Sequence, residues 1–83
     1  MGLKTVEQLR QARAALGWTQ AQVAEAAGVS VPTMKRLESG AGTLSVRLDT
    51  LTLLERALEA QGIQFLEDGQ VAAGPGVAMK GGD

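Results

Sequence analysis

The side chains with the most to offer chemically lie in and just after the stretch from Thr19 to Gly40. Lys35 and Arg36 stand next to each other there, and both donate hydrogen bonds while carrying a positive charge. The chain contains no histidine and no cysteine, which excludes imidazole bases, thiol nucleophiles, disulfides and the usual zinc ligands. No pair of carboxylates converges on one point in the pattern. The sequence therefore predicts a binding protein without enzymatic activity, metal or cofactor.

Two short helices joined by a tight turn are predicted to position these side chains. Thr19 is a typical N-cap, and Gln22 three residues later completes a capping box. Gly28 suits the turn because a residue without a Cβ adopts positive φ easily. Ser30 is the next N-cap, and Pro32 falls in the first turn of its helix, where proline is tolerated. The residues predicted to face the core are Val23, Ala24, Ala27, Val29, Met34 and Leu37.

The flanking sequence predicts two more helices and a strand-forming end. One helix runs from Thr5 to Leu16, with Thr5 and Gln8 as its capping box. The other runs from Ser45, as N-cap, to Gln61. The segment Ile63-Gln64-Phe65 alternates like a strand, Asp68-Gly69 is a turn signal, and a second short strand is predicted at 77–79.

The 83 residues are expected to form a helical domain at 1–61 and a strand-forming tail at 62–83, assigned to dimerisation, that frays at its end. Six cationic and three anionic side chains fall in residues 1–47, against two and six in residues 48–83. This asymmetry indicates that the first part meets an anion. No apolar run reaches the length of a membrane span, so a cytoplasmic protein without a membrane partner is expected.

Arg13 falls on the apolar stripe of the first helix, beside Val6, Leu9 and Leu16. Burying its charge is costly unless a carboxylate meets it, and Glu38 at the end of the third helix is the candidate partner. The alternative is that the Arg13 side chain extends along the helix edge to reach solvent.

Two helices joined by a tight turn, with exposed polar residues on the second, are typical of a helix-turn-helix reader of the DNA major groove. The sequence LRQARAALGWTQAQVAEAAGVSVPTMKRLESG resembles the Cro/repressor-type (XRE) helix-turn-helix family over roughly residues 6–61. The resemblance implies a mainly α fold, four repressor-type helices with a short C-terminal strand or hairpin, and a buried ion pair of Arg13 with Glu38. The tail is similar to that of very short bacterial members of this family, although Lys80 stands alone where relatives often carry several arginines.

The position of each residue then predicts its contact with double-stranded DNA. The start of the third helix enters the major groove, where Arg36 suits guanine and apolar side chains suit thymine methyl groups. Residues predicted to contact bases are Val31, Pro32, Thr33, Lys35 and Arg36. Residues predicted to contact phosphates are Thr19, Gln20, Thr43, Ser45 and Arg47, with Gln20 assigned by the resemblance.

The predicted function is a transcriptional regulator, a repressor, that binds a pseudo-palindromic operator as a homodimer. So few cations per copy bind DNA weakly, and two copies double the contacts. The residues assigned to the dimer interface are Leu54, Leu58, Ile63, Phe65, Val77 and Met79. No small-molecule ligand is expected, because no separate sensing domain is visible. The competing hypothesis is a protein-interaction module, antitoxin-like or anti-repressor, that keeps the helix-turn-helix core.

Overall fold

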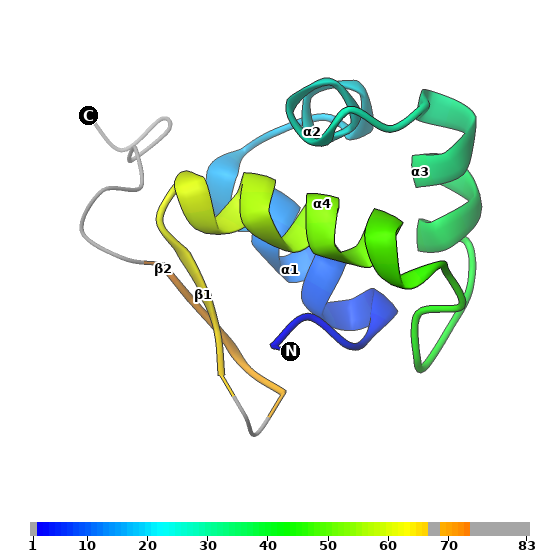
Figure 1. Cartoon of the computed structure of the whole chain (residues 1–83). Coiled ribbons are helices and arrows are strands. Elements are labelled where there is room, and N and C mark those ends of the chain that lie inside the picture. The colour runs from blue at the N-terminus through cyan, green and yellow to red at the C-terminus, as the bar shows by residue number, and fades with distance from the viewer. Residues whose placement is uncertain (1, 67–68, 74–83) are drawn as a thin grey trace.

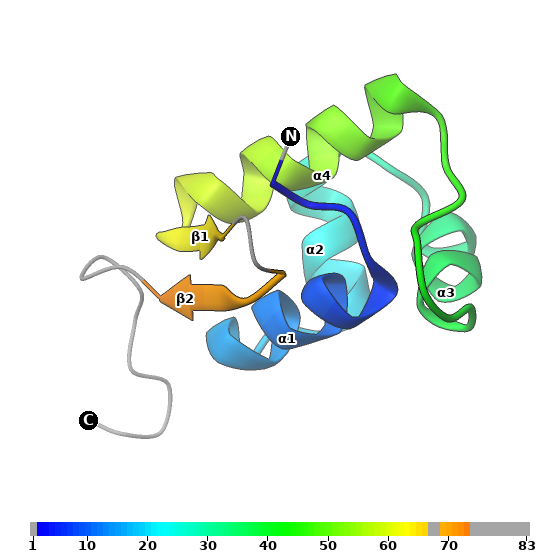
Figure 2. The same ribbon diagram turned by 90° about the horizontal axis from the view of Figure 1, so that it is seen from below.

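A computed structural model of the chain describes residues 2–66 and 69–73. In these residues it contains helices α1 (Val6–Leu16), α2 (Gln20–Ala27), α3 (Val31–Glu38) and α4 (Leu48–Ala60), followed by strands β1 (Ile63–Phe65) and β2 (Val71–Ala73). The hairpin and α3 lie at opposite ends of the molecule, with α1, α2 and α4 between them (Figure 1, Figure 2). The predicted class, four helices with a short C-terminal hairpin, is confirmed.

The first three helices begin and end where their capping residues predict. Thr5 accepts a hydrogen bond from the Gln8 amide at 3.1 Å and returns one from its own amide to the Gln8 side chain at 3.0 Å. Thr19 and Gln22 form the same reciprocal pair, at 3.1 and 2.8 Å. Ser30 caps α3 through a 3.2 Å bond from the Thr33 amide. These contacts satisfy backbone donors that a helix start otherwise leaves unpaired.

The predicted start of the fourth helix at Ser45 is wrong, because α4 begins at Leu48 and its N-cap, Arg47, makes no side-chain capping bond. Residues 42–44 instead run alongside residues 4–6. Thr43 forms an antiparallel bridge with Thr5, and the Leu44 amide donates to the Lys4 carbonyl at 2.8 Å. These long-range bonds hold residues 42–44 outside a helix, and Ser45 is exposed in the loop that follows.

The second strand also differs from the prediction. It forms at Val71–Ala73, whereas the predicted segment at 77–79 lies outside the described residues. Ile63 faces Ala73 and Phe65 faces Val71 across an antiparallel pair. Gly69, at a φ of 88°, closes the connection through a 3.0 Å bond to the Leu66 carbonyl. The turn signal predicted at Asp68-Gly69 thus falls between β1 and β2, and β2 begins two residues after Gly69.

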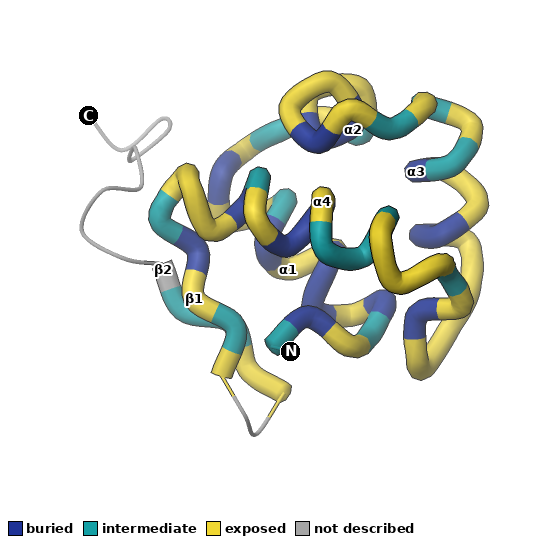
Figure 3. The backbone as a smooth tube through the Cα atoms, viewed as in Figure 1, coloured by how far each residue is buried: buried dark blue, intermediate teal, exposed yellow. Residues whose placement is uncertain are grey.

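Every helix and the first strand contribute to one aliphatic core (Figure 3). The buried apolar residues are Leu3, Val6, Leu9, Ala12, Leu16, Val23, Ala24, Ala27, Met34, Leu37, Leu44, Leu54, Leu58 and Ile63. Leu3 and Leu44 belong to no helix or strand, and periodicity does not predict their burial. Val29 is only half-buried, although it packs against the core as predicted.

Three of the six residues assigned to a dimer interface lie in the core rather than at the surface. Leu54, Leu58 and Ile63 are at most 2% exposed, so they pack the core of a single copy and have no surface left for a second. Phe65 is half-buried and packs against the same core. Val77 and Met79 lie outside the described residues.

Arg13 and Glu38 form an ion pair that joins three helices. Arg13 donates to Glu38 twice, from Nε to Oε2 at 2.8 Å and from Nη2 to Oε1 at 2.9 Å. Arg13 also donates to the Trp18 carbonyl at 3.0 Å, and Gln20 donates from Nε2 to Glu38 Oε1 at 3.0 Å. Arg10 adds a hydrogen bond to the main-chain carbonyl of Glu38. The carboxylate therefore ties α1 and the start of α2 to the end of α3.

The charge of Glu38 is stabilised in spite of its burial. Burial raises the pKa of Glu38. Hydrogen bonds from Arg13 and Gln20, together with the charges of Arg13 and Arg10, lower it by more than burial raises it, so the pKa lies below its usual value. The hydrogen bond to Glu38 correspondingly raises the pKa of Arg13. A carboxyl whose pKa is lowered by folding stabilises the native state above its unfolded pKa, and this contribution is lost as the pH falls through the folded pKa.

We expect Glu38→Gln to lower the free energy of unfolding by about 1–3 kcal/mol at neutral pH, because Arg13 loses a charged acceptor. The difference from wild type should shrink as the pH falls below the usual range of a glutamate, about pH 4.3. Urea unfolding followed by Trp18 fluorescence at several pH values measures both effects. Glu25→Gln, at an exposed position on α2, serves as the control and should change stability by no more than about 0.5 kcal/mol. A loss that stays equal at every pH contradicts the charge argument.

The segment before α1 packs tightly onto β1. Leu3 is fully buried, its amide donates to the Glu55 carboxylate at 2.9 Å, and Gln8 donates to the Gly2 carbonyl at 3.0 Å. A Cβ added to Gly2 would lie 2.7 Å from the Phe65 Cβ and 2.8 Å from the Phe65 carbonyl oxygen. Position 2 therefore requires a glycine, since backbone and Cβ atoms of β1 leave no room for a methyl group.

We expect Gly2→Ala to destabilise the fold by about 1–3 kcal/mol, because the added methyl group overpacks the contact with β1. Thermal unfolding by circular dichroism measures the change. Gly40→Ala is the matched control: its nearest atom would be the Leu37 carbonyl at 3.6 Å, an ordinary contact. That variant should keep or slightly raise the melting temperature. Equal effects of the two substitutions contradict the steric argument.

Candidate nucleic-acid interface

The outer face of α3 presents a short stripe of exposed side chains at one end of the molecule. Pro32, Lys35 and Arg36 are exposed and fall at the i, i+3 and i+4 positions of one helical face. The inner face holds Met34, Leu37 and Glu38, all buried, and Figure 3 shows the alternation along the helix. Because the inner face is anchored by the core and by the ion pair, the outer face is presented rigidly.

Two of the residues predicted to contact bases are less available than the sequence indicates. Val31 is half-buried and packs against the core, so only part of its side chain faces outward. Thr33 is also half-buried, and its hydroxyl lies 2.8 Å from that of Ser30, within the cap of the helix. The surface that α3 offers to a partner is therefore made mainly by Pro32, Lys35 and Arg36.

The residues predicted to contact phosphates lie outside this stripe, at the start of α2 and after α3. Thr19 is exposed at the start of α2, where its hydroxyl accepts from the Gln22 amide and keeps its own proton to donate. Gln20 is half-buried, and one of its two amide hydrogens is engaged by Glu38. Thr43 and Ser45 are exposed on the loop after α3.

A small hollow connects a residue predicted to contact a base with two residues predicted to contact phosphates. It encloses about 170 Å³ and is lined by Arg36 from α3 and by Thr43 and Ser45 from the loop. The structure therefore brings Arg36 together with two of the hydroxyls. Arg47 is placed apart from them, at the start of α4, where it pairs with Asp49 at 3.3 Å. Both side chains of this pair are exposed, so it stabilises the fold little and leaves Arg47 free to reorient.

Arg10 is a residue of this region that the sequence pattern does not reveal. It is exposed on α1 and donates to the last carbonyl of α3, that of Glu38. A cation near the C-terminus of a helix is favourable because it offsets the partial negative charge there. The contact joins positions 28 residues apart, and spacing within one helix gives no signal of it.

Within residues 2–66 and 69–73 no three side chains of the metal-binding types lie together. Among the same residues no helix is both long and apolar enough to cross a membrane.

The comparison with known families agrees with this geometry. The family model described as "Helix-turn-helix domain" matches residues 6–65, which include all four helices and β1. Searches of curated proteins and of solved structures found no match to the chain. Since the matched range covers most of the 83 residues, the chain belongs to the helix-turn-helix domain family.

Proposed function

We propose that this helix-turn-helix chain is a sequence-specific transcriptional regulator of the Cro/repressor type that acts as a repressor. One observation carries the proposal: the exposed stripe of α3, with Lys35 and Arg36, stands at one end of the molecule beside the hydroxyls of Thr43 and Ser45. A helix of this kind enters the major groove while the neighbouring loop and the start of α2 rest on the sugar–phosphate backbone.

Base recognition in this proposal combines one polar contact with apolar ones. Arg36 donates two hydrogen bonds to guanine O6 and N7, a contact that discriminates by roughly 1–3 kcal/mol against other bases. Pro32 and the exposed part of Val31 lack side-chain donors and contact thymine methyl groups instead. Lys35 adds a charged donor on the same face, and Thr33 contributes through its side chain at the edge of the stripe. Specificity then depends also on DNA shape and on the spacing of two half-sites.

Phosphate contacts set the orientation of α3 in the groove. The start of α2 offers the Thr19 hydroxyl, the remaining amide hydrogen of Gln20 and the partly positive helix end. Thr43 and Ser45 donate to phosphates from the loop after α3. Arg47 also donates to a phosphate once its ion pair with Asp49 opens. Because one copy provides few cations, a homodimer on a pseudo-palindromic operator is proposed as the binding species.

An interaction module that binds protein rather than DNA remains the second candidate. The exposed Pro32 at the tip of α3 and the chain's formal net charge of −1 favour it. Selection of bound fragments from a genomic DNA pool separates the two, since a regulator enriches fragments that share one palindromic motif. Enrichment of no motif, together with co-purification of a stoichiometric protein, favours the second candidate.

We expect Arg36→Ala to relax base preference at one position in each half-site of the selected operator, because a bidentate donor to guanine is removed. Binding to a library of single-base operator variants measures the preference at each position. The control is Arg56→Ala, which removes an exposed arginine from α4, outside α3 and the loop. A uniform loss of affinity over all sequences would show that Arg36 binds a phosphate and reads no base.

We expect operator affinity to fall steeply with salt, because each phosphate neutralised by a cation releases condensed counterions. The logarithm of the binding constant should fall with a slope of about −0.9 per neutralised phosphate against the logarithm of salt concentration. Fluorescence anisotropy with the selected operator over a salt series measures this slope. A slope near zero contradicts DNA binding through the charged face of α3.

A further inference from the structure

The side chain of Arg10 begins on α1 and reaches the C-terminal end of α3. It donates from Nη2 to the main-chain carbonyl of Glu38, and the residue is exposed to solvent. A guanidinium has five N–H donors, and this contact uses one of them. The other donors therefore remain available to a partner outside the chain.

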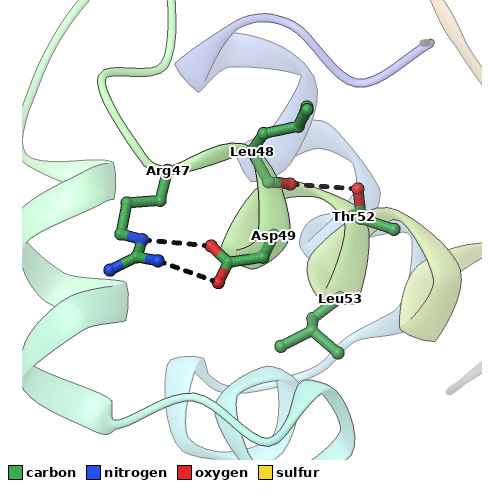
Figure 4. A pocket seen from close by; sticks show the side chains of 5 residues that line it. All are labelled: Arg47, Leu48, Asp49, Thr52 and Leu53. Carbon is green, nitrogen blue, oxygen red and sulfur yellow. Dashed lines mark hydrogen bonds and ion pairs between the residues drawn. The ribbon is translucent and has the colours of Figure 1, made fainter.

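The charge of Arg10 is not compensated in the part of the chain that the structure describes. Arg13 and Glu38 neutralise each other through their two hydrogen bonds, so the group formed with Arg10 keeps one positive charge. Among the described residues no carboxylate forms an ion pair with Arg10. Arg47 differs in this respect, since its guanidinium is paired with the carboxylate of Asp49 at the start of α4 (Figure 4). Arg10 therefore offers an uncompensated charge to an anion.

Arg10 lies between the two groups of side chains that are predicted to contact phosphates. On one side Gln20, at the start of α2, donates to the carboxylate of Glu38, so Gln20 and Arg10 both bind the same residue. On the other side Val6, one turn before Arg10 on α1, lines the hollow that also contains the hydroxyls of the loop after α3. The start of α2, Arg10 and this loop therefore follow one another around the C-terminal end of α3.

We infer that Arg10 is a further phosphate contact, which binds the DNA backbone between the contacts made by the start of α2 and those made by the loop after α3. The inference rests on the proposed function, because it requires α3 to enter a groove of DNA. Guanidinium and phosphate match in geometry as well as in charge, since two parallel N–H donors reach two phosphate oxygens. The bond to the Glu38 carbonyl restricts the Arg10 side chain before DNA binds, so less conformational entropy is lost in the complex.

The salt dependence of DNA binding separates a phosphate contact from a role in the fold alone. Arg10→Gln keeps an N–H donor and removes the charge. It should weaken binding about tenfold at low salt and make the slope of log K against log salt shallower by about 0.9 for each copy bound. Because a phosphate contact reads no base, all sequences should lose affinity equally. Fluorescence anisotropy with the selected operator and with a duplex of random sequence measures both effects.

Two further variants serve as controls for the charge and for its position. Arg10→Lys restores the positive charge and should restore the salt slope of the wild type. Arg56→Gln removes an exposed arginine from α4 and should leave the slope unchanged. Urea unfolding of each variant identifies conditions in which it is folded. A folded Arg10→Gln variant that is less stable than wild type but keeps the full slope overturns the inference, because Arg10 then supports only the fold.

Protection from an arginine-specific reagent tests the same contact in the wild-type chain. Arg10 and Arg56 are both exposed, so phenylglyoxal should modify each of them in the free protein. The selected operator should slow the modification of Arg10 and leave that of Arg56 unchanged, as measured by mass spectrometry of digested samples. Equal rates at Arg10 with and without DNA overturn the contact.

These results distinguish failure of the inference from failure of the proposed function. If the wild type selects one motif and binds it with a steep slope that Arg10→Gln leaves unchanged, the inference fails and the regulator stands. If Arg10→Gln reduces the slope on the random duplex while no motif is selected, the phosphate contact stands and sequence-specific regulation fails. A wild type that binds neither duplex overturns both.

Discussion

The carboxylate of Glu38 is the contact on which the arrangement of the first three helices depends. It is 5% exposed and receives hydrogen bonds from Arg13 and Gln20. An isolated buried charge of this kind is unfavourable, and only a complete set of donors makes it tolerable. Because the donors come from α1 and from the first residue of α2, the helices must adopt one relative orientation to satisfy it. That requirement also fixes the direction in which the outer stripe of α3 faces.

Local signals predicted most of the helical structure. Thr5, Thr19 and Ser30 each cap a helix by accepting a hydrogen bond from the third residue of that helix. Contacts between residues so close in the sequence can be predicted from the sequence alone. The start of α4 was not predictable in this way, because the bridge of Thr43 to Thr5 arises from a segment 38 residues away. Its long-range hydrogen bonds outweigh the preference of Ser45 for a helix cap.

The candidate site was predictable in its residue types and less so in its details. Helical spacing placed Pro32, Lys35 and Arg36 on one face, and the structure does the same. Helical spacing could not show that Val31 is half-buried or that Arg10 reaches the end of α3, since both depend on how neighbouring helices pack. The abundance of leucine on α4 likewise left open which residues fill the core. Leu54 and Leu58 do, whereas Leu48 and Leu53 remain outside.

The bridge between residues 4–6 and 42–44 has a consequence for how the loop after α3 meets a ligand. Its backbone is already hydrogen-bonded to the segment before α1, and Leu44 is anchored in the core. A loop ordered in the free protein loses little conformational entropy when it binds, so its polar contacts are retained as affinity. In the proposed function, packing around Leu3 and Leu44 thereby contributes to DNA recognition without either side chain touching the DNA. The interior of this small domain and its binding face are two sides of one preorganised unit.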